Sequence, residues 1–182
     1  MKTQLPQVAI IGRANVGKST LFNRLVEKNK AIVSDIAGTT RDRNIDQVAW
    51  QGRDFILVDT GGIDIDEKKA GEIEKNILAQ TRRAIADVDL ILFLTDAKAG
   101  LIPTDRELAK EIVKNKLNDR TILVGNKADS LKWRQAANDM YALNLGEPQM
   151  ISAASGSGCG DLLDLIIKRL PKKKAKVAQV KE

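Results

Sequence analysis

The chain has 182 residues, which is enough for one domain that buries its own core without disulfide bonds or a structural metal. Its single cysteine, Cys159, excludes an internal disulfide. No apolar run is long enough to form the core of an export signal or to span a bilayer. We therefore expect a soluble, cytoplasmic protein of one domain with no membrane partner.

The formal net charge of +6 is unevenly distributed, because residues 171–182 hold five lysines and one glutamate and carry +4 of it. We expect this tail to be a solvated segment, and contact with nucleic acid through phosphates is the alternative. The six aromatic residues form no group that resembles a base-stacking platform: Phe22, Trp50, Phe55, Phe93, Trp133 and Tyr141. The sequence does not indicate an autonomous RNA-binding module.

Apolar runs suited to buried strands alternate with helical patterns along the chain. We expect strands at residues 8–11, 55–58, 89–95, 121–124 and 149–151. We expect helices at residues 19–25, 70–86, 104–117, 131–143 and 160–170. Thr104 with Glu107 predicts a capping box at the start of the third helix. This alternation predicts an α/β fold with a mostly parallel sheet and helices on both faces.

One further strand is expected at residues 44–50, where polar and apolar residues alternate before a turn at residues 51–52. It would form an antiparallel edge hairpin with the strand at residue 55, which makes six strands in all. Residues 28–43 and 61–71 lack sustained periodicity, so we expect loops there. In an open α/β sheet, ligands bind beyond the carboxyl ends of the strands, where these loops and those after residues 124 and 151 would converge.

The loop after the first strand fits the P-loop pattern GxxxxGK[ST]. Its residues are Gly12, Arg13, Ala14, Asn15, Val16, Gly17, Lys18 and Ser19, followed by Thr20 in the helix. The glycines let the backbone turn so that its N–H groups face the phosphates of a nucleotide triphosphate. Lys18 would lie against the β- and γ-phosphates, and the Ser19 hydroxyl would ligate Mg²⁺. A glycine-containing turn that matches the pattern by chance is the alternative.

The loop after the strand at residues 55–58 reads Asp59, Thr60, Gly61, Gly62, which is the DxxG pattern of guanine-nucleotide proteins. Asp59 would hold Mg²⁺ through a water molecule. The Gly62 N–H would donate to the γ-phosphate, so that loss of this phosphate releases the loop. An ordinary aspartate and glycine turn is the alternative.

Residues 38–42 offer the hydroxyls of Thr39 and Thr40. One of them should ligate Mg²⁺ when the γ-phosphate is present, and we favour Thr40. The alternative is a paired-threonine turn with ordinary local hydrogen bonds.

The loop after the strand at residues 121–124 matches NKxD with Asn126, Lys127, Ala128 and Asp129. The Asp129 carboxylate would accept from the ring N–H and the exocyclic amine of guanine, and adenine has no matching donors. A helix N-cap at Asp129 is the alternative.

A short loop of small residues follows the last strand: Ser152, Ala153 and Ala154. It matches the loop whose backbone N–H backs the guanine ring. Ordinary small residues before a helix are the alternative.

These motifs in this order resemble the translation-factor-related GTPases. Four sequence segments are similar to the first GTPase domain of the bacterial EngA (Der) family: GRANVGKSTLFNRL, AGTTRDR, VDTGGID and NKAD. The related Era and MnmE proteins usually have alanine or proline where Gly61 stands. The resemblance covers residues 7–170 and implies a P-loop NTPase, namely a Ras-like GTPase domain that binds GTP or GDP with Mg²⁺.

Members of that family continue into a second GTPase domain and a KH-like domain and act in assembly of the large ribosomal subunit. We therefore expect a GTPase domain at residues 1–170 and the start of an interdomain linker at residues 171–182. The ribosomal role and these partners are implied by the resemblance alone.

Ras-like proteins orient the attacking water with a glutamine directly after DxxG, but this chain has Ile63 there and no histidine anywhere. The resemblance suggests that K⁺ compensates, held by Asn15 and by carbonyls of the loop before Thr39. Asn15, Lys18, Thr40 and Gly62 are then the candidate catalytic residues. A local backbone hydrogen bond is the alternative role for Asn15.

Two other functions remain open from the sequence. The first is a nucleotide-dependent binding module with negligible turnover of GTP, an alternative that Ile63 in the glutamine position favours. The second is an ATP-dependent P-loop kinase. The NKxD residues do not favour it, because they are a guanine signature, and the sequence shows no evident lid or acceptor site.

Overall fold

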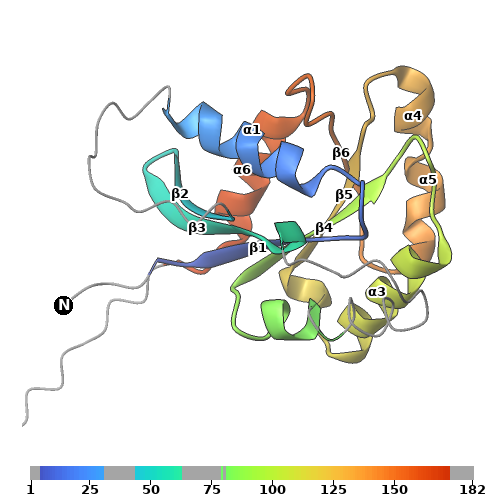
Figure 1. The fold of residues 1–182 in the computed structure, drawn as a ribbon, viewed down its shortest axis with the longest axis horizontal. Coiled ribbons are helices and arrows are strands. Elements are labelled where there is room, and N and C mark those ends of the chain that lie inside the picture. Colours follow the sequence, from blue (N-terminus) through green and yellow to red (C-terminus); the bar gives the residue numbers. More distant parts are fainter. Residues whose placement is uncertain (1–4, 31–43, 63–78, 80, 173–182) are drawn as a thin grey trace, which may run out of the picture.

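The structure is a computed structural model of the chain, and it describes residues 5–30, 44–62, 79 and 81–172. In this part of the chain six strands form one sheet (Figure 1). In spatial order they are β2 (Ile45–Trp50), β3 (Arg53–Asp59), β1 (Gln7–Ile11), β4 (Leu90–Asp96), β5 (Thr121–Asn126) and β6 (Gln149–Met150).

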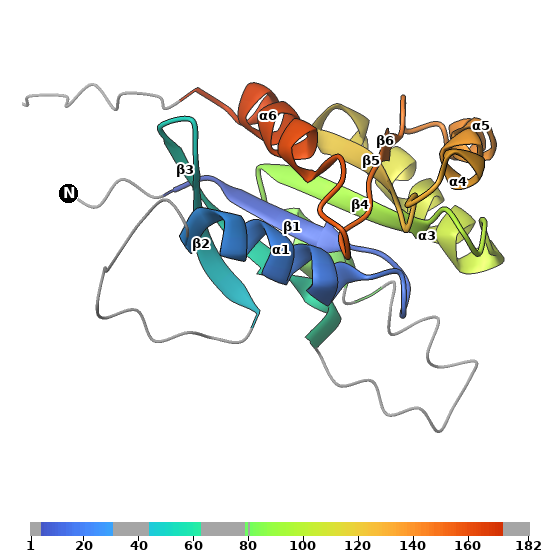
Figure 2. The ribbon, with the colours of Figure 1, turned by 90° about the horizontal axis from the view of Figure 1, so that it is seen from above.

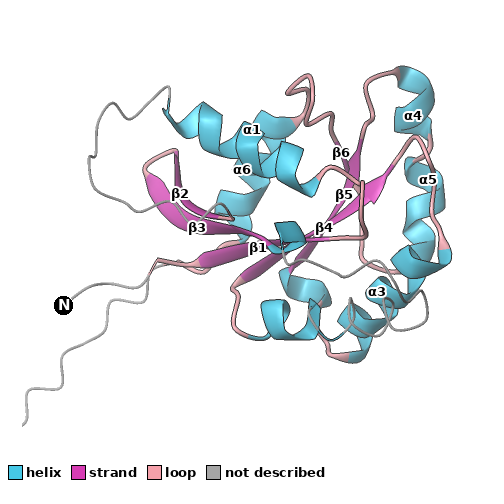
Figure 3. Ribbon diagram, in the orientation of Figure 1, coloured by secondary structure: helices cyan, strands magenta, loops and turns pink. Residues whose placement is uncertain are grey.

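All neighbouring strands run parallel except β2, which pairs antiparallel with β3 at the edge (Figure 3). The antiparallel hairpin turns at Gln51 and Gly52, which both have positive φ. Together with the helices this arrangement confirms the predicted fold class, a mostly parallel six-stranded sheet with one antiparallel edge strand.

The helices of the described residues cover both faces of the sheet: α1 (Lys18–Lys30), α3 (Pro103–Lys114), α4 (Leu131–Gln135), α5 (Ala137–Met140) and α6 (Cys159–Arg169). Figure 2 looks onto one face, where α1 and α6 lie side by side over the strands. The other face packs against α3, α5 and the helical residues 81–86. None of the helices in these ranges is both long and apolar enough to cross a membrane.

Side chains of the central strand β1 pack into a hydrophobic core on each face of the sheet. Val8 and Ile10 pack with α1 and α6, whereas Ala9 and Ile11 pack with α3 on the opposite face, as the alternation of side chains along a strand requires. Strands β4 and β5 are buried at every position for the same reason. Burial on both faces fixes the carboxyl ends of these strands at one edge.

Two helix predictions need correction. Residues 28–30 belong to α1, which extends five residues beyond the predicted end at Leu25. The predicted helix over residues 131–143 is divided into α4, α5 and a 3₁₀ turn, η3 (Tyr141–Leu143). Helix α4 buries no residue and α5 only Met140, so little tertiary packing supports a continuous helix there.

The predicted capping box of Thr104 with Glu107 is wrong. Helix α3 begins at Pro103, and Ile102 is its N-cap residue. The Asp105 carboxylate accepts a hydrogen bond from the Ile102 N–H at 3.0 Å, which satisfies a free donor at the helix start. Proline at the first helical position sets the N-cap residue two positions earlier than Thr104.

Candidate functional site

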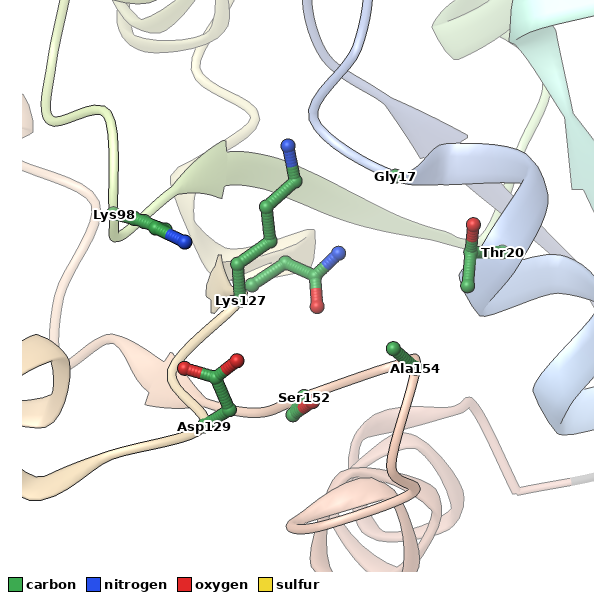
Figure 4. Close-up of a pocket in the computed structure, with 8 residues that line it drawn as sticks. Gly17, Thr20, Lys98, Lys127, Asp129, Ser152 and Ala154 are labelled. Atoms are coloured by element: carbon green, nitrogen blue, oxygen red, sulfur yellow. The ribbon is translucent and has the colours of Figure 1, made fainter.

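The loops that follow β1, β5 and β6 surround one cavity of about 220 Å³ at the carboxyl edge of the sheet (Figure 4). Residues from all three loops line it, together with one residue that follows β4: Gly17, Thr20, Lys98, Asn126, Lys127, Asp129, Ser152 and Ala154. Helix α1 begins at its rim with Lys18. The P-loop, the NKxD motif and the loop of small residues after β6 are thus brought together at the edge where open α/β sheets bind ligands.

Two glycines of the phosphate loop have no room for a side chain. Gly12 has φ of 151°, and a Cβ atom there would lie 2.6 Å from the Leu94 carbonyl oxygen. Gly17 has φ of 98°, and a Cβ atom would lie 2.3 Å from Nδ2 of Asn126. Both the backbone conformation and the close contacts therefore require glycine, and the loop forms an open cradle of backbone groups.

Lys18 bends back over this loop. Its Nζ donates to the carbonyl oxygens of Gly12 at 2.8 Å and Arg13 at 2.7 Å. Burial lowers the pKa of the Lys18 ammonium, although the nearby charge of Asp59 acts in the opposite direction. An anion in the cradle would supply the charge that the two neutral carbonyls do not.

Oxygen atoms gather beside Lys18. The Ser19 hydroxyl donates to Oδ2 of Asp59 at 2.9 Å, and the Gly61 N–H donates to its Oδ1 at 2.9 Å. The Thr60 hydroxyl donates to the Ile10 carbonyl at 2.7 Å and fixes the turn η1 (Thr60–Gly62) on β1.

A hydroxyl and a carboxylate are ligands that Mg²⁺ accepts. The described residues contain no cluster of three or more His, Cys, Asp or Glu side chains that would hold a metal without other ligands. The Ser19 hydroxyl and the Asp59 carboxylate fit Mg²⁺, which usually keeps waters and takes oxygens from substrate phosphates.

Asn126 joins the phosphate loop to the other two loops. Its side chain is 2% exposed, and its Nδ2 donates to the Val16 carbonyl at 2.9 Å. Its Oδ1 accepts from the Ala153 N–H, also at 2.9 Å. The Ala128 N–H donates to the Ile151 carbonyl and ties the last two loops directly. Because these groups are buried and paired, the loops form one rigid frame.

Asp129 is exposed on the wall of the cavity, where its carboxylate is seen in Figure 4. Nothing in the described part of the chain donates a hydrogen bond to it. Helix α4 begins at Leu131 with Ser130 as its N-cap residue, so Asp129 does not cap the helix, contrary to the alternative considered above. An unpaired carboxylate at this position is available to two neighbouring N–H donors of a ligand.

Two residues of the site were missed by sequence reasoning, Asp96 and Lys98. The Lys127 Nζ lies 2.6 Å from Oδ2 of Asp96 and also donates to the Asn15 carbonyl at 2.7 Å. The N–H groups of Lys98 and Ala99 donate to Asp96 at 2.9 Å. Burial alone would raise the pKa of Asp96, but these hydrogen bonds and the Lys127 charge hold it below its ordinary value.

Asp96 could have been identified, because it ends β4 at the same edge as the motifs. Lys98 carries no sequence signal beyond its closeness to Asp96.

Asn15 has φ of 66°, which asparagine tolerates better than most residues, and its side chain is exposed. Within the described ranges that side chain makes no hydrogen bond, so it does not shape the loop as the alternative role required. Ala14 and Thr20 are also exposed on the loop and the first turn of α1. Thr40 and Ile63 lie outside the described residues.

A family model described as "50S ribosome-binding GTPase" matches residues 7–127 of the chain. Among curated proteins, GTPase Der of Caldanaerobacter subterraneus subsp. tengcongensis is 52% identical over 165 residues, which are 90% of this chain and 37% of that protein. GTPase Der of Lactobacillus johnsonii is 46% identical over 163 residues, which are 90% and 36% of the two chains. The chain thus spans little more than a third of these relatives.

Solved structures agree with the fold. An Era variant from Aquifex aeolicus bound to GDP·AlF₄⁻ has a TM-score of 0.71 and 32% identity, with 94% of this chain and 58% of that chain covered. The FeoB G-domain from Methanococcus jannaschii has a TM-score of 0.63 and 24% identity, with 91% and 98% covered. The chain belongs to the 50S ribosome-binding GTPase family, within which it is a GTPase domain of the Der type.

Proposed function

We propose that this site binds GDP and Mg²⁺·GTP, that it hydrolyses GTP, and that the domain serves as a switch in assembly of the large ribosomal subunit. The observation that carries the proposal is the pair of hydrogen bonds made by Asn126. They hold the phosphate loop and the base-binding loops in one frame around a cavity, as a ligand with phosphates at one end and a base at the other requires.

At the phosphate end, the backbone N–H groups of residues 12–18 and the start of α1 would face the phosphates. Lys18 would exchange its two carbonyl acceptors for phosphate oxygens, whose charge would keep it protonated despite its burial. Ser19 directly, and Asp59 through water, would hold Mg²⁺, which neutralises charge on the phosphates. Thr40 is proposed as the second hydroxyl ligand.

At the base end, the Asp129 carboxylate would accept from the ring N–H and the exocyclic amine of guanine. Adenine would leave that carboxylate facing a ring nitrogen without a proton, which is an unfavourable pairing. Lys127 would stay anchored to Asp96 and Asn15 while its stem lies along the cavity beside the base.

Hydrolysis needs positioning and charge neutralisation more than covalent chemistry. The Gly62 N–H is proposed to donate to the γ-phosphate. Asn15 is proposed to hold K⁺, which would supply positive charge where other GTPases use an arginine finger. The side chain of Asn15 supports this role, because it is exposed at the mouth of the phosphate loop and makes no hydrogen bond to any residue that the structure describes.

The role at the large ribosomal subunit is supported by the description of the matching family. An Era structure solved with MgGDPNP and a segment of 16S ribosomal RNA supports contact of such domains with ribosomal RNA in general. Because the chain spans about 37% of its Der relatives, we propose that the whole protein also holds a second GTPase domain and a KH-like domain, with this chain as the first domain. A ribosomal role would place the protein in the cytoplasm.

The decisive experiment measures single-turnover hydrolysis of GTP and ATP by the purified chain in KCl and in NaCl at equal ionic strength. We expect turnover of GTP only, faster in KCl by about tenfold or more. Turnover of ATP at the same rate would contradict guanine recognition. Tight GTP binding without turnover in either salt would favour the binding module, to which Ile63 in the glutamine position points.

Asn15→Gly tests the potassium site without the strain that alanine would add at positive φ. We expect GTP turnover in KCl to fall to the rate measured in NaCl, because the amide ligand is lost while the backbone conformation is kept. An undiminished advantage of KCl in this variant would remove Asn15 from the potassium site.

A further inference from the structure

We propose that Arg24, on α1, is a positioning residue for the purine base: it orients the loop at residues 152–158 so that the Ala154 N–H faces a carbonyl group on the base. This inference rests on the proposed function, because it concerns how the loop expected to face the guanine ring is held in place. Arg24 lies in the segment GRANVGKSTLFNRL but outside the P-loop pattern of residues 12–19, and its partners are about 130 residues away in the chain.

The contact consists of one guanidinium group that donates to two consecutive backbone carbonyls. Nε of Arg24 donates to the Ala153 oxygen at 2.8 Å, and its Nη2 makes a short hydrogen bond to the Ala154 oxygen. A planar guanidinium has its donors in a fixed fork, so two such bonds set the orientation of both carbonyls.

The orientation of a carbonyl also determines that of the next N–H. In a trans peptide the Ala153 C=O and the Ala154 N–H point in opposite directions, and the chain contains no cis peptide bond among the described residues. Since Arg24 holds the oxygen toward α1, the Ala154 N–H points away from α1. Ala154 lines the cavity (Figure 4).

The neighbouring N–H groups of residues 152, 153 and 155 are already used. Those of Ser152 and Ala153 donate at 2.9 Å to the Ser157 carbonyl and the Asn126 side chain, and that of Ser155 donates to the Ser152 hydroxyl at 3.3 Å. In the part of the chain that the structure describes, the Ala154 N–H has no partner. Ala154 also lines the cavity, so its N–H is the donor of residues 152–155 that remains for a ligand.

The loop depends on such side-chain restraints. It consists of serine, alanine and glycine up to residue 158, so it has no large side chain with which to pack itself down. Gly156, at φ of 85°, lies against Arg24: a Cβ atom there would be 3.7 Å from the arginine Cδ. Asn126 holds one side of the loop and Arg24 the other, and α1 connects that second restraint to the phosphate loop.

Because the Ala154 N–H is a hydrogen-bond donor, the group that it recognises on the base must be an acceptor. An N–H at this point fits a carbonyl at position 6 of a purine, as in guanine, beside the ring N–H that Asp129 would accept. Adenine has an amine at that position, so two donors would face each other. Arg24 would then contribute to guanine selectivity without touching the nucleotide.

The test compares GDP with 2-aminopurine riboside diphosphate by calorimetry on the full chain. This analogue keeps the exocyclic amine but lacks both the 6-carbonyl and the ring N–H, so the effect of an Arg24 variant is measured on each ligand against the wild type. Arg24→Ala should weaken GDP binding about tenfold and leave the analogue's affinity unchanged, so the preference of the protein for GDP over the analogue falls about tenfold. Arg24→Lys, which retains one strong donor, should recover part of that preference.

Arg53→Ala is the matched control. Arg53 also donates to backbone carbonyls, those of Ile167 and Pro171 at the end of α6, away from the cavity. This variant should lose thermal stability without any change in the ratio of the two affinities.

Equal weakening of both nucleotides by Arg24→Ala would show that Arg24 has only a structural role, and unchanged affinities would overturn the inference altogether. If the alanine variant fails to fold, Arg24→Lys must show the reduced preference on its own. A wild-type chain without preference for GDP over ADP would instead refute the proposed function itself.

Discussion

Asp96 belongs to no sequence motif, yet its carboxylate pairs with the Lys127 side chain, which spans the site. It is 6% exposed through its side chain and accepts from Lys127 and from two backbone N–H groups, and Lys127 in turn reaches the phosphate loop at Asn15. The carboxylate therefore fixes one end of Lys127, which then connects the base side of the cavity to the phosphate side.

The pH dependence of stability should reveal this role. The pKa of Asp96 is lower in the folded protein than its ordinary value of 3.8, so its stabilising contribution is complete above pH 3.8 and is lost as the pH falls through the folded pKa. We expect Asp96→Asn to lower the free energy of unfolding by about 1 to 2 kcal/mol at pH 6 and by less below pH 3.8.

Urea unfolding of the wild type and the variant at pH 6 and pH 3.5 measures this. Glu107→Gln, which breaks an exposed pair with Lys110, is the control and should have little effect at either pH. If Asp96→Asn lowers the free energy of unfolding equally at both pH values, the ionised Asp96 carboxylate is not the cause of the loss.

At the scale of elements, strand positions were predicted better than helix limits. Short continuous apolar runs between loop signals are typical of strands that are buried on both faces, so the sequence predicted β1, β4 and β5. The break after Gln135 and the start of α3 depended on which residues are buried and on Asp105, whose role as a cap is not visible from Thr104 and Glu107. Helix limits are set by such tertiary contacts as much as by propensity.

Asp105 also connects α3 to the phosphate loop. Its Oδ2 lies 3.2 Å from Nε of Arg13, and both side chains are largely buried. Arg13 Nη2 and Asp105 Oδ1 have no hydrogen-bond partner among the described residues, so this buried pair is incompletely satisfied. Removing one member leaves an uncompensated buried charge, which costs about 3 to 5 kcal/mol.

A double-mutant cycle tests this connection. Asp105→Asn and Arg13→Met should each lower the free energy of unfolding, and the double variant should be less destabilised than the sum of the two. Asparagine keeps an acceptor for the Ile102 N–H, so the cap of α3 is retained and the cycle reports on the ion pair. Additive effects in chemical unfolding would show that the two side chains do not interact energetically.

At the scale of the molecule, the order of motifs along an alternating strand and helix pattern was enough to predict which loops meet. The partners that hold those loops could not be predicted, because Arg24 with Ala153, Arg13 with Asp105 and Lys127 with Asp96 are pairs distant in sequence. Each pair depends on the register and spacing of whole elements. The motifs thus identify the groups that face the ligand, whereas the fold supplies the groups that hold them in place.

Because the frame joins phosphate and base loops, a ligand that fits both should stabilise the whole domain. GDP with Mg²⁺ at 100 times its dissociation constant would add about 2.7 kcal/mol to the free energy of unfolding. For a domain of this size that corresponds to a rise of roughly 5 to 10 °C in melting temperature. ADP at the same concentration should produce no comparable rise.

Asp129→Asn should reverse this response to the base. An amide can donate to the second carbonyl of xanthine but cannot accept from both donors of guanine, so xanthosine diphosphate should raise the melting temperature of the variant while GDP no longer does. The wild-type chain should show the opposite order in the same thermal scans. If GDP stabilises the variant as much as the wild type, the base lies elsewhere, and the carboxylate on the cavity wall has another role.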